Sequence, residues 1–205
     1  MGRDGDVDES KRATLRRFAA LGAASPLVGL ASASNSDAPD AIAGYLTATP
    51  GAHFSKVRDD LQLGTGETQH HLRRLESDGA VQSRKDGEYK RYFPADRFSE
   101  FEQVALGYLR KDTPCGMVIT LLERPSLSAS ALAEELDVSR PTVSKHATDM
   151  AEDGLLSRED GYEIEHPETL LLLLVQYADS FGPDATRIAS KADGLIAYDP
   201  TEASE

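Results

Sequence analysis

The chain has little of several residue types and motifs on which many enzymes and secreted domains depend. A single cysteine, Cys115, excludes an intramolecular disulfide and any multi-thiolate metal site within one chain, and it fits a reducing compartment. The sequence has no phosphate-binding glycine loop, no HExxH motif and no nucleophile elbow, and its 5 histidines lack metal-ligand spacing. We therefore predict that the protein is not an enzyme, and that it needs no cofactor and no obligate metal.

Lysine is also scarce. The chain has 7 Lys and 15 Arg against 19 Asp and 16 Glu, which gives a formal net charge of −13. A solvated acidic surface is the ordinary interpretation, and the excess of Asp over Lys resembles proteins of salt-accumulating halophilic archaea. At molar salt the Debye length is only ~3 Å. Net acidity therefore does not exclude a nucleic-acid partner, and local charge matters more.

No hydrophobic run is long enough to cross a membrane. The N-terminal tail, residues 1–37, places the basic stretch 10–17 before a weakly apolar run, Phe18 to Ala33, as a secretory signal does, and it contains a degenerate twin-arginine pattern. This run has 16 residues, whereas a spanning helix needs about 20. We expect a flexible tail with one amphipathic helix, or a mis-assigned start of the chain; membrane association through residues 10–33 and export are the alternatives.

An internal repeat is the clearest positive feature. Residues 61–81 align with residues 136–156 at a constant shift of 75 and without a gap. The matched positions share an apolar frame and a terminal Asp-Gly: Leu61 with Leu136, Leu63 with Val138, His71 with His146, Leu75 with Met150, Asp78 with Asp153 and Gly79 with Gly154. We therefore predict two copies of one structural unit, module 1 over residues 38–94 and module 2 over residues 113–166.

In module 1, three helices and a hairpin follow one another. Helices are expected over residues 40–48 and 54–61, and a third follows with Thr65 as its N-cap and Gly79 as its left-handed stop. Helical spacing predicts that its buried face consists of Thr68, Leu72 and Leu75. Asp86-Gly87 is a strong hairpin signal between strands at residues 81–85 and 88–93.

Module 2 repeats this order with a shorter hairpin. Its helices are expected at residues 114–123 and 130–136, followed by one that Ser139 caps. The third helix should bury Val143, Ala147 and Met150. The hairpin strands are expected at residues 155–159 and 162–165.

Helix, helix, turn, helix and hairpin is the order of a winged helix-turn-helix domain. The segments TGETQHHLRRLESDGAV (65–81) and SRPTVSKHATDMAEDGLL (139–156) resemble recognition helices of ArsR- and MarR-type winged-helix regulators. The ArsR-like pattern is Thr68-Gln69-His70-His71-Leu72 in the first and Val143-Ser144-Lys145-His146-Ala147 in the second. Over residues 38–166, the tandem arrangement is similar to archaeal transcription regulators with two such modules. The cysteine box of ArsR metal sensors is missing, so metal sensing of that kind is not implied.

The resemblance implies a mainly α fold with small β-hairpin wings, and sequence-specific binding of double-stranded DNA. Residues 65–93 carry a net charge of +1, whereas residues 140–165 carry one of −4. Because phosphate contacts supply most of the affinity for DNA, this local charge favours module 1 as the module that binds DNA. We predict that recognition helix 65–78 and basic wing 81–93 bind DNA through Thr65, Gln69, His70, Arg73, Arg74, Arg84, Lys85, Lys90 and Arg91.

Individual roles follow from side-chain chemistry. The Gln69 amide could form a bidentate contact with adenine, while Arg73 or Arg74 could bind guanine or a phosphate. His71 either packs on the core or contacts DNA. Wing packing is expected of three aromatic residues, Tyr89, Tyr92 and Phe93. In module 2 a second DNA contact is expected from Arg140, Ser144 and Lys145.

The remaining segments link and extend the modules. Residues 95–112 should form a linker helix with an apolar stripe, residues 167–182 a C-terminal helix that forms a homodimer or packs within the chain, and residues 183–205 an acidic tail. We expect a cytoplasmic, homodimeric DNA-binding protein. The alternative function is a protein-docking module that does not touch DNA, because tandem winged helices also serve that purpose.

Overall fold

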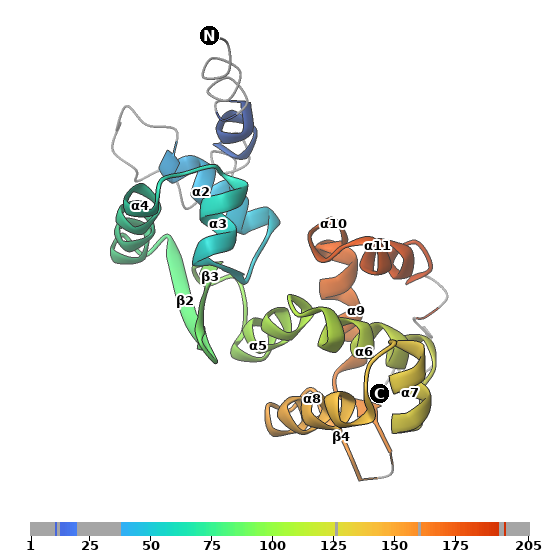
Figure 1. Cartoon of the computed structure of the whole chain (residues 1–205). Helices are drawn as coiled ribbons and strands as arrows, with labels where there is room; N and C mark the ends of the chain where they lie inside the picture. The colour runs from blue at the N-terminus through green and yellow to red at the C-terminus, as the bar shows by residue number, and fades with distance from the viewer. Residues whose placement is uncertain are drawn as a thin grey trace, which may run out of the picture. The chain divides into compact units, whose positions relative to one another are not determined.

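The computed structural model describes residues 11, 13–19, 38–125, 127–159, 161–192 and 195. They belong to two compact units, Met1–Gln103 (unit 1) and Val104–Glu205 (unit 2), whose boundary lies within the linker helix α5, Glu100–Leu109 (Figure 1). The elements of unit 1 that precede α5 are α2 (Ala38–Ala48), β1 (Ala52–His53), α3 (Phe54–Asp60), α4 (Thr65–Ser77), β2 (Val81–Asp86) and β3 (Tyr89–Pro94). Those that follow α5 in unit 2 are α6 (Asp112–Glu123), α7 (Ala129–Glu135), α8 (Arg140–Glu152), β4 (Leu156–Ser157), β5 (Glu163–Ile164), α9 (Pro167–Gln176), α10 (Ala178–Phe181) and α11 (Pro183–Ala189).

The core of unit 1 is formed by α2, α3, α4 and one side of a small sheet. Its antiparallel strands are ordered β1-β3-β2. All three helices contribute buried side chains to this core, among them Ile42, Tyr45, Leu46, Val57, Leu72 and Leu75, and β3 contributes Tyr92. Strand β1 was not foreseen, because a two-residue strand has no period of its own and forms only through its pairing with β3.

Unit 2 has the same helical framework with a smaller wing. Its core includes Met117, Leu132, Val143, Met150 and Leu155, all with 0% exposure. The two strands β4 and β5 have two residues each. The hairpin therefore extends much less than in unit 1.

The predicted repeat is confirmed with the same shift. Helices α3 and α4 begin and end 75 residues before α7 and α8. The turn residues Gln62 and Asp137 both have positive φ, of 54° and 52°. Gly79 and Gly154 follow the two recognition helices with φ of 71° and 74°, a conformation that glycine adopts without strain. The two modules thus share backbone geometry as well as sequence.

Several element boundaries differ from the sequence-based expectations. Gly64, not Thr65, is the N-cap of α4. The linker helix begins at Glu100 because Ser99 caps it: Ser99 Oγ accepts a hydrogen bond from the Glu102 backbone N–H at 3.2 Å, and Glu102 Oε2 accepts one from the Ser99 N–H at 2.7 Å. The segment expected to be an acidic tail begins with the helix α11.

The expected single C-terminal helix is divided into α9 and α10 at Tyr177, whose φ and ψ are not helical. Four of its leucines, Leu170, Leu171, Leu173 and Leu174, are buried within unit 2. Arg110 holds α10 in place, because its guanidinium donates to the Ser180 carbonyl at 2.6 Å and lies 4.3 Å from the centre of the Phe181 ring. Packing within the chain therefore covers most of this apolar surface.

The expected N-terminal tail is helical at residues 11 and 13–19. Most of the signal-like run, residues 20–33, lies outside the described part of the chain. Among the described residues, no helix has both the length and the apolarity needed to cross a bilayer.

Candidate nucleic-acid interface

Helix α4 presents one polar face to solvent. Thr68, Leu72 and Leu75 are buried, as predicted from their spacing. The predicted DNA-contacting residues of this helix are all exposed: Thr65, Gln69, His70, Arg73 and Arg74. Gln69 and Arg73 are four residues apart, so their side chains lie one above the other on the exposed face.

Side chains at both ends fix this helix. Glu67 Oε2 accepts a hydrogen bond from the Gly64 N–H at 3.3 Å, and the Thr68 hydroxyl donates to the Gly64 carbonyl at 2.9 Å. At the other end, Arg74 lies 3.6 Å from the Asp78 carboxylate. The exposed face is therefore presented on a helix with satisfied ends.

The basic wing is joined to α4 through Glu76, a residue that sequence reasoning counted only as a negative charge. Lys90 Nζ lies 2.8 Å from Glu76 Oε1, and the Ser83 hydroxyl donates to the same oxygen at 2.5 Å. In the antiparallel register Ser83 pairs with Tyr92 and Lys85 with Lys90, which places these four side chains on one face of the hairpin. Ser83 and Lys90 both contact Glu76 of α4, so this face of the hairpin is turned toward that helix. We call this contact the wing clasp, formed by Glu76, Ser83 and Lys90.

Other wing and helix cations are paired at the surface. Arg84 lies 3.1 Å from Glu100, with its side chain 33% exposed. Such exposed ion pairs contribute about 0–1 kcal/mol to stability. Arg84, Lys90 and Arg74 can therefore exchange their carboxylates for phosphates at small cost.

Arg73 and Lys85 have a different environment from the paired cations. Both are exposed, and within the part of the chain that the structure describes neither takes part in an ion pair. A phosphate that approached them would not have to displace a carboxylate. Among the described residues, no carboxylate therefore offsets the charge of either side chain.

Arg91 does not face solvent, contrary to its predicted role in DNA contact. Its side chain is 4% exposed and lies 2.5 Å from Asp86, and a second guanidinium nitrogen donates to the Gly51 carbonyl at 3.0 Å. In the register of the hairpin its side chain lies on the face opposite the wing clasp. Its backbone is opposite His53, where β1 pairs with β3. Arg91 therefore joins the hairpin to the loop before β1 and is corrected from a DNA contact to a structural residue.

The remaining aromatic and histidine residues of module 1 divide between core and surface. Tyr92 and Phe93 are 6% and 0% exposed, which confirms wing packing, whereas Tyr89 is 52% exposed and lies beside the His53 ring at 4.9 Å. His71 is half-buried, and burial, followed by the neighbouring charge of His70, lowers the pKa of His71. These surroundings favour core packing for His71.

In module 2 the corresponding surface is more acidic. Arg140, Ser144 and Lys145 are exposed, as expected of a second contact. Lys145 lies 3.2 Å from Asp149, one turn further along α8, and Arg158 of the wing donates to the Thr148 hydroxyl at 2.6 Å. Of Arg140, Lys145 and Arg158, only Arg140 has no side-chain partner among the described residues.

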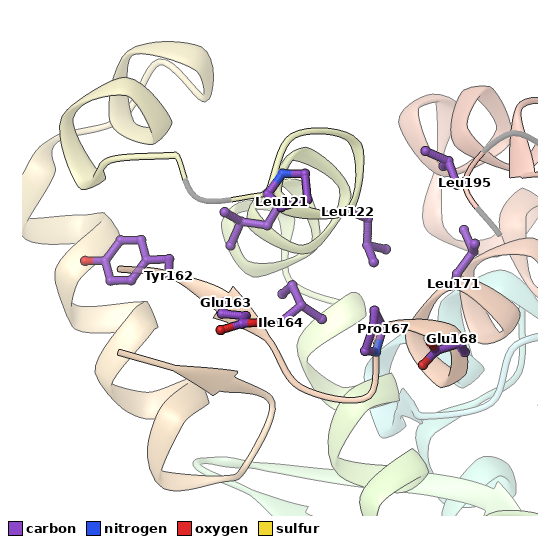
Figure 2. A pocket seen from close by; sticks show the side chains of 10 residues that line it. Leu121, Leu122, Tyr162, Glu163, Ile164, Pro167, Glu168, Leu171 and Leu195 are labelled. Atoms are coloured by element: carbon purple, nitrogen blue, oxygen red, sulfur yellow. The ribbon is translucent and has the colours of Figure 1, made fainter. Parts of the chain in front are cut away.

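Unit 2 also contains a pocket that the sequence did not indicate. It has a volume of about 320 Å³ and lies between α6, β5 and α9. Figure 2 shows Leu122, Ile164, Pro167 and Leu171 around it. Glu163 and Glu168 also line it, so the pocket combines apolar side chains with two carboxylates.

Two three-helix modules with hairpin wings and exposed recognition helices define the chain as a tandem winged helix-turn-helix protein, of the class found in transcription regulators. Comparison with known families agrees. Residues 36–106 match a family model described as an N-terminal HTH domain, and residues 111–162 match the MarR family.

A curated relative gives the same class. The chain is 27% identical over 121 residues to an uncharacterized HTH-type transcriptional regulator of Methanocaldococcus jannaschii. The alignment covers 58% of this chain and 30% of that protein. The chain thus spans less than a third of the length of that relative.

Proposed function

We propose that the protein is a transcription regulator that binds double-stranded DNA in a sequence-specific manner through α4 and the wing of unit 1. The observation that carries this proposal is the exposed surface in which Gln69 and Arg73 project from one helix face, with the unpaired Lys85 on the adjoining wing. The recognition helix would lie in the major groove and the wing would contact the backbone. The family matches support a DNA-binding regulator, and the assignment of residues is our own inference.

The cationic part of the surface is tested by removing the two unpaired charges. Arg73→Gln combined with Lys85→Gln should weaken binding to every duplex and lower the slope of log affinity against log salt by about 1.8, since each phosphate contact contributes ~0.9. The matched control is Arg124→Gln with Lys191→Gln in unit 2, which removes the same charge from residues paired with Glu135 and Glu123. Equal binding by the two double variants would contradict the assignment.

Base recognition is tested at Gln69. Gln69→Ala removes a neutral bidentate amide, so it should relax preference at one base position by about 1–3 kcal/mol and leave non-specific binding and its salt slope unchanged. Competitive selection from a randomised duplex library measures both. If the sequence preference is unchanged, selectivity must come from module 2 or from DNA shape, and not from Gln69.

The second candidate function, a protein-docking module, is favoured by one observation. Residues 140–165 of module 2 carry a net charge of −4 in the sequence, which suits a basic protein surface better than phosphate. A chain that binds no duplex in the library at low salt would leave docking as the function. Chromatin immunoprecipitation would then recover no enriched sites.

We further propose that two copies of the chain associate through α9. Although four leucines of this helix are covered within unit 2, Leu172 and Val175 remain 61% and 38% exposed on one side of it. A two-fold axis would require a roughly palindromic operator whose half-sites are one helical turn apart, or a multiple of that spacing.

A further inference from the structure

The N-terminal residues that resemble a targeting signal pack against the core of unit 1. Leu15 and Phe18, three residues apart on one side of a helix, are partly buried against the core that contains Ile42 and Tyr45. The Phe18 and Tyr45 rings meet edge to face with their centres 5.3 Å apart, a favourable geometry for aromatic pairs. This helix, residues 13–19 together with Lys11, is called the N-terminal helix below.

The same helix carries one cation beside α4 and two more that face solvent. Lys11 lies on the side of Leu15 and Phe18, and its Nζ is 3.7 Å from the Glu67 carboxylate in the first turn of α4. Arg16 and Arg17 are exposed. The Arg17 guanidinium lies 5.9 Å from the centre of the Phe18 ring.

These contacts place positive charge at a functionally important end of α4. The N-terminal residues of a recognition helix approach the bases and the flanking phosphates most closely. Glu67 stands at this end and would repel phosphate, but Lys11 compensates its charge. Without Lys11 the first turn of α4 would present an uncompensated carboxylate to DNA.

We infer that the N-terminal helix is part of the DNA-binding surface of unit 1, in which Leu15 and Phe18 dock the helix and its three cations contact backbone phosphates next to the start of α4. The inference rests on the proposed function, since the partner is the same duplex. For residues 11 and 13–19, the inference replaces the expected flexible or membrane-directed tail with a DNA-contacting element.

The test uses the full-length chain and two variants that separate charge from docking. Lys11→Gln, Arg16→Gln and Arg17→Gln together should leave thermal stability unchanged, weaken duplex binding about tenfold at low salt, and lower the salt slope by about 1 to 3. Leu15→Ala with Phe18→Ala should weaken binding similarly, and should in addition lower the melting temperature of unit 1. The charge-matched control, Arg124→Gln, Arg187→Gln and Lys191→Gln, should bind as the wild type does.

The outcomes distinguish this inference from the function on which it rests. If the triple charge variant binds DNA like the wild type while Arg73→Gln with Lys85→Gln loses binding, the inference is wrong and the proposed function stands. If the docking variant has an unchanged melting temperature, the helix is not part of unit 1 and the inference also fails. If the wild type binds no duplex, the proposed function itself fails.

Discussion

Two arginines of module 1 show how strongly environment separates residues of one type. Arg73 and Arg91 both lie in the basic segment from which DNA contact was predicted. Arg73 stands on the exposed face of α4, whereas Arg91 is 3% exposed and bridges Asp86 to the Gly51 carbonyl. A buried guanidinium contributes to folding through the partners that it satisfies, and an exposed one is available to phosphate.

Replacement by glutamine should therefore affect different properties: Arg91→Gln the stability of the fold, and Arg73→Gln the binding of DNA. Arg91→Gln removes the donor to the Gly51 carbonyl and breaks the ion pair between a buried guanidinium and Asp86, so the free energy of unfolding should fall by on the order of 3 kcal/mol. Arg73→Gln should change stability by less than about 0.5 kcal/mol and should weaken DNA binding. Urea denaturation and duplex titration of both variants measure this contrast; a stable Arg91→Gln chain with impaired binding would restore Arg91 as a DNA contact.

Half-buried histidines make the stability of the fold dependent on pH. Burial is the main cause that lowers the pKa of His71 and of the corresponding His146 below the ordinary value of 6.5. The unfolded chain therefore binds protons that the folded chain does not, so stability is present above about pH 6.5 and is lost as pH falls through the lowered pKa values. The free energy of unfolding should decrease between about pH 7.5 and about pH 5.5.

His71→Gln should reduce this pH dependence, because glutamine does not titrate. An exposed residue of the same helix that does not titrate provides the control, since Gln69→Ala should leave the slope as in the wild type. Urea denaturation at the two pH values measures the slope for each chain. An equal slope in wild type and His71→Gln would show that other groups cause the acid sensitivity.

Among the secondary-structure elements, the recognition helix and the wing act as one surface because the wing clasp joins them. Glu76 accepts the Ser83 hydroxyl hydrogen bond and pairs with Lys90. Lys90 also lies 5.2 Å from the centre of the Tyr92 ring. The clasp fixes the hairpin against α4 and, at the same time, neutralises a cation that could contact phosphate.

Glu76→Gln should separate these two consequences. Loss of the ion pair should lower the free energy of unfolding by about 1 kcal/mol, while duplex affinity rises several-fold because Lys90 is released and a carboxylate is removed near the phosphates. The double variant Glu76→Gln with Lys90→Gln should lose much of the gain that Lys90 provides. If Glu76→Gln lowers affinity, the clasp orients the wing for binding, and that effect outweighs the release of charge.

At the scale of the whole molecule, one framework appears twice with two different surfaces. Helix bounds, the positive φ of the turn residue and the glycine stop recur at a shift of 75 residues. Charge and wing length do not recur, since the two wing strands of module 1 have six residues each and those of module 2 have two. The repeat therefore preserves the core and leaves the exposed faces free to differ in function.

Self-association is the prediction at this scale. Leu172→Gln with Val175→Gln on α9 should shift a dimer to monomer, because two exposed apolar side chains of this helix would no longer be covered by a second copy. Light scattering at high salt measures the mass of both chains, and the duplex footprint of the variant should shorten to one half-site. A wild-type chain that is monomeric at all concentrations would exclude the dimer.

Much of the fold followed from local pattern. Helical spacing placed Thr68, Leu72 and Leu75 in the core, and Asp86-Gly87 marked the hairpin turn, because period and turn chemistry are properties of neighbouring residues. The tandem winged helix-turn-helix class was predicted from the repeat. The exposed residues of α4 were also found correctly, since one helix face determines the other.

Tertiary structure alone decided which cations are available. Arg91 is buried through a carbonyl 40 residues away in sequence, and Lys90 and Arg84 pair with carboxylates 14 and 16 residues away. Likewise, Lys11 lies beside Glu67 only because Leu15 and Phe18 pack on the core. A net charge counted along the sequence cannot contain this information, because burial and pairing depend on distances that exist only once the elements have packed against one another.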